Sequence, residues 1–348
     1  MTVPTARLGG AYDTTRLIKG GWQLAGGHGA IDRDAAIADT LAYAESGVTT
    51  FDCADIYTGV EELLGEARAR WHARHGAAAP TLRIHTKCVP DLDRLATITR
   101  ADLRALIDRS RSRLRTEQLD LVQFHWWDFS VPRYVEVLQW LQEFQREGAI
   151  RLLGLTNTGL AQVAEIERAG ITIAAHQVQV SLLDRRALGA MAAHAATQGT
   201  ALLAYGTLAG GFLHERWLGQ PAPAEPLENR SLVKYRLIID ECGGWDAFQA
   251  LLVILARIAA AHHTTIGTIA VAWVLAQPAV AAAIVGSRNR AHLAETVRIP
   301  QVALTADDHA AIAAWSSGHP GPQGDIYALE RDRSGRHGSI MRYNLNRA

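Results

Sequence analysis

The feature that most constrains this chain is a repeated alternation of strand-like and helix-like segments, with polar side chains where strands end. One short run of β-branched and aromatic residues ends at Asp52, and Tyr57 follows in the next loop. Two later runs lead into Lys87 and His125. Such runs predict buried strands. If the strands are parallel and form a barrel, their carboxyl ends meet at one face, so we expect these four side chains to form a proton-transfer site.

The number of alternating segments predicts the fold class. Alternation of this kind is typical of a parallel sheet covered by helices, and eight repeats favour a closed (β/α)8 TIM barrel of the α/β class. Helices are expected at 32–44, 61–75, 100–114, 133–146, 160–169 and 185–197. Strands are expected at 16–24, 48–52, 82–86, 119–124, 151–155, 173–178, 201–204 and 282–285.

Two segments depart from the alternation. After the seventh strand, residues 206–244 carry Pro221, Pro223 and Pro226 and predict a long loop, which either folds over a ligand or forms a solvent-exposed insertion. Residues 318–348 are rich in Gly, Pro and Arg, and this C-terminal extension either docks on the barrel rim or extends into solvent. We therefore expect one domain over 1–348, with a core at about 16–312.

Charge and apolar patterning exclude several classes of partner. The formal net charge of the 348 residues is zero and the pI is about 7.3, which gives no support for binding nucleic acid or an acidic membrane. The apolar stretch 269–285 is interrupted at Gln277 and Pro278 and is too short to span a bilayer continuously. A buried helix, a turn and a buried strand explain it better.

Cysteine and histidine spacing bears on compartment and metals. Cys53, Cys88 and Cys242 form an odd set without CxxC spacing, which indicates a reducing compartment and a cytoplasmic protein. His262 and His263 are adjacent, so they point in different directions on a helix. The remaining candidate pair, His72 and His75, has no Cys or carboxylate at ligand spacing. We expect no metal site.

Six sequence blocks resemble the aldo-keto reductase family and occur in the family's order. They extend over roughly 16–312, nearly the whole chain. The blocks are Phe51-Asp52-Cys53-Ala54-Asp55-Ile56-Tyr57, Glu61-Glu62-Leu63-Leu64-Gly65, Thr86-Lys87, Asp120-Leu121-Val122-Gln123-Phe124-His125, Gly154-Leu155-Thr156-Asn157 and Gly286-Ser287-Arg288. The resemblance implies a barrel enzyme that interconverts an aldehyde or ketone and its alcohol by hydride transfer from a nicotinamide cofactor.

The chemistry of carbonyl reduction suits the four polar residues. Hydride transfer creates an alkoxide that must be protonated, and the unperturbed tyrosine pKa of about 10 is high for this task. A neighbouring Lys87 ammonium, held by Asp52, would lower the pKa of Tyr57, while His125 would hydrogen-bond the carbonyl oxygen. The resemblance implies the same roles. Taken singly, each residue could instead serve packing or turn formation.

The resemblance also implies where the nicotinamide binds. Asn157 and Gln177 would hydrogen-bond its carboxamide, with Thr156 adjacent. Tyr205 would stack on the ring and fix which face delivers hydride.

The phosphate end is implied to lie after the seventh and eighth strands. Small residues there let backbone amides approach the pyrophosphate. Arg288 can pair with a ribose 2′-phosphate, which favours NADP(H), with NAD(H) as the alternative. Glu295 fits the adenine contact, but His292 stands where the family usually has Gln or Arg, and Thr296 where it has Asn. The expected phosphate contacts are Gly206, Leu208, Gly210, Gly286 and Ser287.

A small-molecule carbonyl compound or alcohol is the expected partner, and the sequence does not predict an oligomeric state. Trp22, Asp55, Trp126 and Trp127 are expected to line its pocket, and Asp55 beside Tyr57 would suit a sugar-like substrate. Two alternatives stay open at this stage. One is a non-catalytic, NADP(H)-sensing partner subunit of the same fold. The other is a Schiff-base enzyme with Lys87 as its nucleophile.

Overall fold

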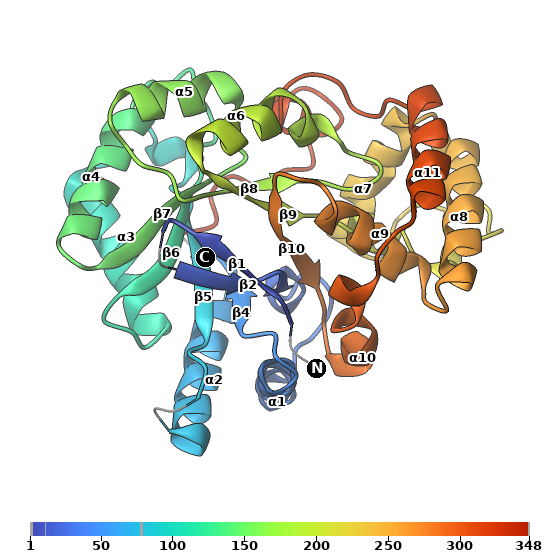
Figure 1. Ribbon diagram of the computed structural model, residues 1–348. Helices are drawn as coiled ribbons and strands as arrows, with labels where there is room; N and C mark the ends of the chain where they lie inside the picture. The colour runs from blue at the N-terminus through green and yellow to red at the C-terminus, as the bar shows by residue number, and fades with distance from the viewer. Residues whose placement is uncertain (1–2, 11, 77–78, 347–348) are drawn as a thin grey trace.

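Eight parallel strands form a closed barrel in the computed structural model, which describes residues 3–10, 12–76 and 79–346 (Figure 1). This confirms the predicted (β/α)8 class. Neighbours around the barrel follow the order β10-β3-β4-β5-β6-β7-β8-β9. The strands are β3 (Leu17–Gly20), β4 (Thr50–Asp52), β5 (Arg83–Cys88), β6 (Leu119–Phe124), β7 (Ile150–Thr156), β8 (Ala175–Gln179), β9 (Ala201–Tyr205) and β10 (Val280–Gly286).

The strand register brings the polar strand ends together. Lys87 on β5 pairs with Gln123 on β6, and Thr156 on β7 pairs with Gln177 on β8. Because successive strand side chains point to opposite faces, Leu121 packs inside the barrel with Ala175, Leu203 and other apolar residues, and Gln123 lies one inward position further on. The barrel interior is thus apolar around Leu121 and polar toward the carboxyl ends of the strands.

A hairpin that sequence patterning did not predict closes the other end of the barrel. Strands β1 (Thr5–Leu8) and β2 (Tyr12–Thr15) pair antiparallel. Leu8 and Tyr12 belong to the apolar cluster inside the barrel. The Tyr12 hydroxyl lies 3.2 Å from Nε2 of His85 on β5. Ligand access is therefore restricted to the end where the strands finish.

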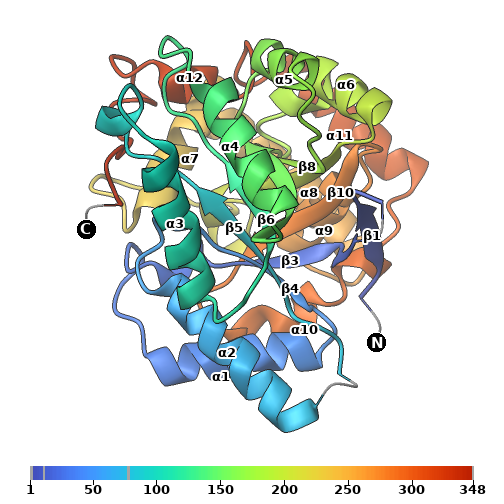
Figure 2. The same cartoon turned by 90° about the vertical axis from the view of Figure 1, so that its left-hand side faces the viewer.

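Helices surround the barrel and form the second layer (Figures 1 and 2). Their ends follow local sequence rules: Asp32 caps α1 through the N–H of Ala35, and Thr99 with Asp102 forms a capping box on α3. The helices are α1 (Arg33–Glu45), α2 (Val60–His75), α3 (Arg100–Arg113), α4 (Tyr134–Arg146), α5 (Leu160–Arg168), α6 (Ala190–Gln198), α7 (Arg230–Glu241), α8 (Gly244–Ala261), α9 (Ile266–Leu275), α10 (Leu293–Thr296), α11 (Ala306–Gly318) and α12 (Ala328–Arg331).

One helix among the described residues, α8, is long and apolar enough to cross a membrane by length and composition alone. Its apolar face packs against α9 and α11, and Phe248, Leu251 and Leu255 are fully buried. Burial in the helical layer accounts for its composition. The apolar stretch 269–285 is divided between α9 and β10, which confirms the predicted helix, turn and strand.

The segment 206–244 is more ordered than the predicted loop. It contains two short 3₁₀ helices, Ala209–Gly211 and Glu215–Trp217, and the twelve-residue helix α7. Asn229 caps α7 by accepting the N–H of Leu232 at 3.1 Å. Leu232 and Tyr235 are buried at helical spacing. The prolines precede this helix and obscured its pattern in the sequence.

The C-terminal segment docks on the rim at the carboxyl ends of the strands. Arg331 donates to the backbone oxygens of Trp126 and Asn157, and the Asn346 side chain donates to the Val89 oxygen at 2.6 Å. Of the two arrangements open at the sequence level, the described residues of the tail adopt the docked one. Residues 347 and 348 lie outside the described residues.

Candidate active site

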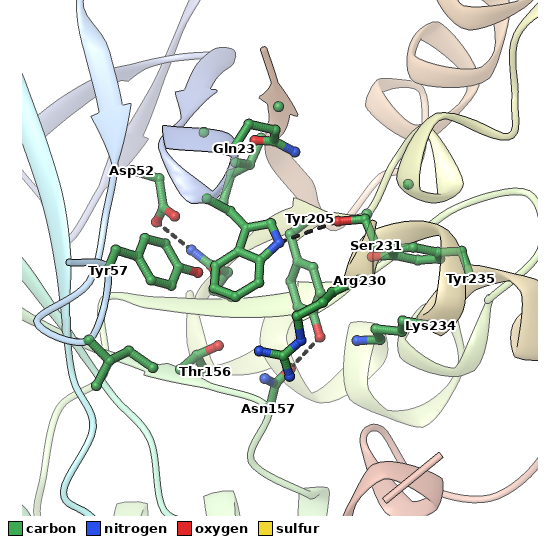
Figure 3. Close-up of a pocket in the computed structure, with 18 of the residues that line it drawn as sticks. Gln23, Asp52, Tyr57, Thr156, Asn157, Tyr205, Arg230, Ser231, Lys234 and Tyr235 are labelled. Carbon is green, nitrogen blue, oxygen red and sulfur yellow. Dashed lines mark hydrogen bonds between the residues drawn. The ribbon is translucent and has the colours of Figure 1, made fainter. Parts of the chain in front are cut away.

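A cavity of about 620 Å³ opens at the carboxyl ends of the strands, and its wall contains all four predicted catalytic residues. Asp52 ends β4, Lys87 lies near the end of β5, and His125 follows β6 directly. Tyr57 projects from the loop after β4 toward the same space (Figure 3). The expectation that the strand ends bring these side chains together therefore holds.

Lys87 connects the carboxylate and the phenol. Its Nζ lies 2.6 Å from Oδ2 of Asp52 and 5.1 Å from the centre of the Tyr57 ring. Burial lowers the pKa of Lys87, but the Asp52 carboxylate outweighs burial and the net shift of that pKa is upward. Lys87 therefore stays an ammonium at neutral pH.

The phenol responds differently from the sequence-based expectation. Burial raises the pKa of Tyr57, and Lys87 opposes this shift without reversing it. Burial is the largest influence on this pKa, and the Asp52 carboxylate, which is paired with Lys87, adds a smaller upward shift. Tyr57 is consequently a protonated acid across the neutral range.

Two glutamine amides that face the barrel interior hold the second oxygen of Asp52. Gln123 and Gln177 donate to Oδ1 at 3.1 and 2.6 Å. Gln177 also donates to Oε1 of Gln123 at 2.9 Å. Both N–H groups of Gln177 are thus used, and only its Oε1 remains to bind a ligand. Sequence reasoning missed Gln123, although a polar residue in an apolar strand was a usable signal.

His125 is buried and neutral. Burial, with the positive charge of Arg331, lowers the pKa of His125 to about 3. Its Nδ1 lies 3.3 Å from the carbonyl oxygen of Thr156, which can only accept, so Nδ1 carries the proton. Nε2 then has a lone pair and has no partner among the described residues. In this tautomer Nε2 offers no proton to a substrate oxygen, so the orienting role predicted for His125 needs the tautomer with the proton on Nε2.

The residues expected at the nicotinamide also line the cavity. The Tyr205 hydroxyl donates to Oδ1 of Asn157 at 2.8 Å (Figure 3). Asn157 has a left-handed backbone with φ of 56°, and its own carbonyl binds Arg331. These contacts fix both side chains at the rim. The other predicted cofactor residues in the wall are Thr156, Gln177, Gly206, Leu208, Gly210 and Gly286.

Four predicted cofactor residues lie beyond the cavity wall: Ser287, Arg288 and His292 on the connection from β10 to α10, and Glu295 within α10. The Arg288 guanidinium donates to the Ala30 oxygen at 2.8 Å, which brings the glycine-rich loop after β3 beside it. The His292 and Glu295 side chains are 3.5 Å apart and mostly exposed.

The substrate-binding residues predicted from sequence separate into two groups. Trp22 and Trp127 line the cavity. Trp126 is fully buried and donates to the Val131 oxygen at 3.0 Å. Asp55 lies under the C-terminal segment, where its Oδ2 accepts from the Val89 N–H at 3.0 Å and from Asn346 at 3.4 Å. Asp55 and Trp126 are therefore outside the wall.

The buried position of Asp55 predicts a pH-dependent stability. Burial raises the pKa of Asp55 from 3.8 to about 7, so the folded protein binds this proton more tightly than the unfolded chain. The stabilisation is complete at low pH and is lost as pH rises from about 4 to about 7. In chemical denaturation, the free energy of unfolding of Asp55→Asn relative to that of the wild type should increase by roughly 2 kcal/mol from pH 5 to pH 8. If the difference in unfolding free energy between Asp55→Asn and the wild type is the same at pH 5 and pH 8, this prediction is wrong.

Comparison with known proteins identifies the family. The sequence profile of the aldo/keto reductase family matches residues 16–316. The chain belongs to the aldo/keto reductase family. Membership confirms the resemblance seen in the sequence and makes the protein an NAD(P)H-dependent oxidoreductase that acts on carbonyl compounds.

Individual relatives are distant. Flagellar radial spoke protein 5 of Chlamydomonas reinhardtii is 27% identical over 256 residues, which are 63% of this chain and 48% of that protein. The chain thus spans about half the length of this relative. A glycerol dehydrogenase from Gluconobacter oxydans superposes with a TM-score of 0.76 at 24% identity, covering 93% of this chain and 98% of that one.

A second solved structure shares the fold. The aldo/keto reductase of Klebsiella pneumoniae, in complex with NADP and acetate, superposes with a TM-score of 0.68 at 21% identity. The alignment covers 93% of this chain and 98% of that one. At these identities the structural likenesses establish the barrel.

Several wall residues of this aldo/keto reductase were missed at the sequence level. Trp22 Nε1 donates to the Ser231 hydroxyl at 3.3 Å, and His28 Nε2 lies 3.0 Å from the same oxygen. These contacts link the loop after β3 to α7. The missed wall residues include Gln23, His28, Arg230, Ser231, Lys234, Tyr235, Tyr327, Ile340, Met341, Arg342 and Leu345.

Proposed function

We propose that the protein interconverts a small carbonyl compound and its alcohol with NADP(H), and that Tyr57 supplies the proton during reduction. The observation that carries the proposal is the Asp52–Lys87–Tyr57 arrangement at the cavity wall. It offers a substrate oxygen one acidic hydrogen, beside a cation that stabilises the phenolate left behind. The buried cysteines have free thiols, which supports a reducing, cytoplasmic setting.

The choice between two proton donors rests on their protonation. His125 has a pKa of about 3, and its single proton is bound to the Thr156 oxygen. Tyr57 keeps its proton because its pKa is raised. As the carbonyl carbon gains hydride, the oxygen takes the Tyr57 proton, and water later restores that proton. His125 forms the wall beside the reacting oxygen.

The residues present fit a dinucleotide. Gly206, Gly210 and Gly286 expose backbone along one side of the cavity. A Cβ at Gly286 would come within 2.2 Å of the Gln23 amide, so a larger residue there would displace Gln23, which also lines the cavity. Tyr205 and Asn157 would hold the nicotinamide, Gln177 would accept from its carboxamide, and Ser287, Arg288, His292 and Glu295 would contact the phosphate and adenine end.

Support for NADP(H) over NAD(H) comes from two sources. Arg288 presents a guanidinium, whose fork of donors suits a 2′-phosphate, and the related Klebsiella pneumoniae structure contains NADP. When bound, the cofactor supplies or accepts the hydride. The test follows absorbance at 340 nm with NADPH or NADH and a panel of aldehydes and ketones. Cofactor binding without turnover of any carbonyl would favour the NADP(H)-sensing subunit instead.

The protonation states predict an asymmetric pH dependence. Because the Tyr57 pKa is raised above 10 and that of His125 is about 3, neither group titrates near neutrality. Reductive kcat/KM should change by less than about threefold between pH 6 and pH 9, whereas alcohol oxidation should rise throughout, since it needs the phenolate.

Asp55→Asn is the matched control for this profile. If the reductive kcat/KM of the wild type changes with pH near 7 and that of Asp55→Asn does not, the titrating group is Asp55, whose pKa is about 7. If the reductive kcat/KM of Asp55→Asn still changes with pH between 6 and 7, the assignment of Tyr57 as the proton donor is contradicted.

A further inference from the structure

We propose that the substrate carries an anionic group, a carboxylate or a phosphate, and that Arg230 and Arg342 bind it at the cavity wall. This inference rests on the proposed carbonyl reduction and adds the substrate class. The two arginines come from distant parts of the chain, the first residue of α7 and the docked C-terminal segment. Figure 3 shows Arg230 extending from α7 into the cavity.

The charge inventory of the wall is positive. Asp52 is the one carboxylate among the described wall residues, and it is paired with Lys87. Lys234 lies 3.6 Å from Glu330, behind the wall. Neither Arg230 nor Arg342 forms an ion pair with any described residue. Two cationic charges at the cavity therefore have no counter-charge from the protein.

Arg230 is bound to the C-terminal segment that carries Arg342. Arg230 donates to the Ile340 oxygen at 3.1 Å, two residues before Arg342. Besides burial, the charge of Arg342 lowers the pKa of Arg230, as expected for neighbouring like charges. A bound carboxylate or phosphate would relieve this repulsion, and the planar guanidinium fork matches either group.

Aromatic contacts place the C-terminal segment near the reacting centre. Tyr343, next to Arg342, lies with its ring 5.1 Å from Trp127, and Trp127 lies 4.3 Å from the His125 ring. The glycines suited to the cofactor phosphates follow β9 and end β10, and Gly210 lies against Ser231, next to Arg230 on α7. Arg342 is thus on the substrate side of the cavity, and Arg230 is tied to the same segment.

An anionic substrate differs from the sugar-like substrate that the sequence led us to expect. That expectation depended on Asp55 facing the substrate, but Asp55 lies outside the wall under the C-terminal segment. The charged groups that the cavity presents without partners are cations, so an oxo acid or a phosphorylated aldehyde fits it better than a neutral sugar.

The test compares matched carbonyl substrates that differ in charge. These are 4-oxobutanoate with its methyl ester, and glyceraldehyde 3-phosphate with glyceraldehyde. In the wild type, kcat/KM for one anionic member should exceed that of its neutral partner by about tenfold or more. In Arg230→Gln/Arg342→Gln this preference should fall by about 10–100-fold, mainly through KM, because charge-assisted hydrogen bonds are lost.

Arg336→Gln is the matched control, since Arg336 is an exposed tail arginine paired with Asp240 at 3.0 Å. It should keep the wild-type preference. Equal losses for the anionic and neutral members in the double variant would indicate general damage and overturn the inference.

A titration of NADPH binding by fluorescence quenching shows whether the arginines bind the anionic group of the substrate or the phosphates of the cofactor. If the double variant weakens NADPH binding as much as it raises KM for the anionic substrate, the arginines bind cofactor phosphate and the inference is wrong. Failure of the proposed function looks different, because then no carbonyl is reduced at all. Reduction of neutral carbonyls without any preference for anions would overturn only this inference.

Discussion

Tyr57→Phe should reduce kcat for carbonyl reduction by about 10²–10⁴-fold while NADPH binding stays within about threefold of wild type. The substitution removes only the hydroxyl that protonates the developing alkoxide. It keeps the ring that packs 5.1 Å from Trp22 and beside the Lys87 ammonium. His125 cannot replace the proton, because its pKa is about 3. Single-turnover absorbance at 340 nm and fluorescence titration measure the two quantities.

Tyr134→Phe provides the matched control. Its hydroxyl donates to Glu165 on α5, and Tyr134 is not part of the described cavity wall. Turnover of this variant should match wild type. Wild-type turnover in Tyr57→Phe would show that water or another group supplies the proton, and the assignment of Tyr57 would then be wrong.

The fold and the centre of the site were predictable because their signals are local in sequence. Strand periodicity and polar strand ends located Asp52, Lys87 and His125, and parallel closure of the barrel necessarily brings such ends to one face. The first three predictions required only the position of each residue along its own strand. Asn157 and Tyr205 were instead implied by the resemblance to the family, and both line the cavity.

The rest depends on contacts between distant segments. That both amide hydrogens of Gln177 are used by Asp52 and Gln123 follows from the barrel register, which strand patterns do not specify. Asp55 is covered because Asn346 docks on it. No helical or strand periodicity marks that docking. The sequence could therefore name Asp55 but could not decide which side of the wall it occupies.

Lys87→Met is the second substitution with a large expected effect, and it should affect stability and turnover together. Asp52 is 4% exposed and would retain only the Gln123 and Gln177 amides as partners. Breaking a buried pair by removing one partner costs about 3–5 kcal/mol. Turnover should also fall, because no cation remains to stabilise the Tyr57 phenolate. Denaturant unfolding and 340 nm assays measure the two losses.

Lys87→Met/Asp52→Asn separates these two effects. Removing the uncompensated carboxylate should restore part of the unfolding free energy, because an amide is less costly to bury than an unpaired charge. Turnover should stay low, since the ammonium is still missing. Recovery of turnover in the double variant would show that Lys87 serves only to neutralise Asp52.

The wild type tests the remaining Schiff-base alternative. Because the pKa of Lys87 is raised by Asp52, its amine is protonated and a poor nucleophile. Borohydride added with a carbonyl substrate should therefore leave the mass of the Lys87 peptide unchanged. A peptide mass increased by the reduced substrate would instead make Lys87 a nucleophile, and the ion pair with Asp52 would then have to open during the reaction.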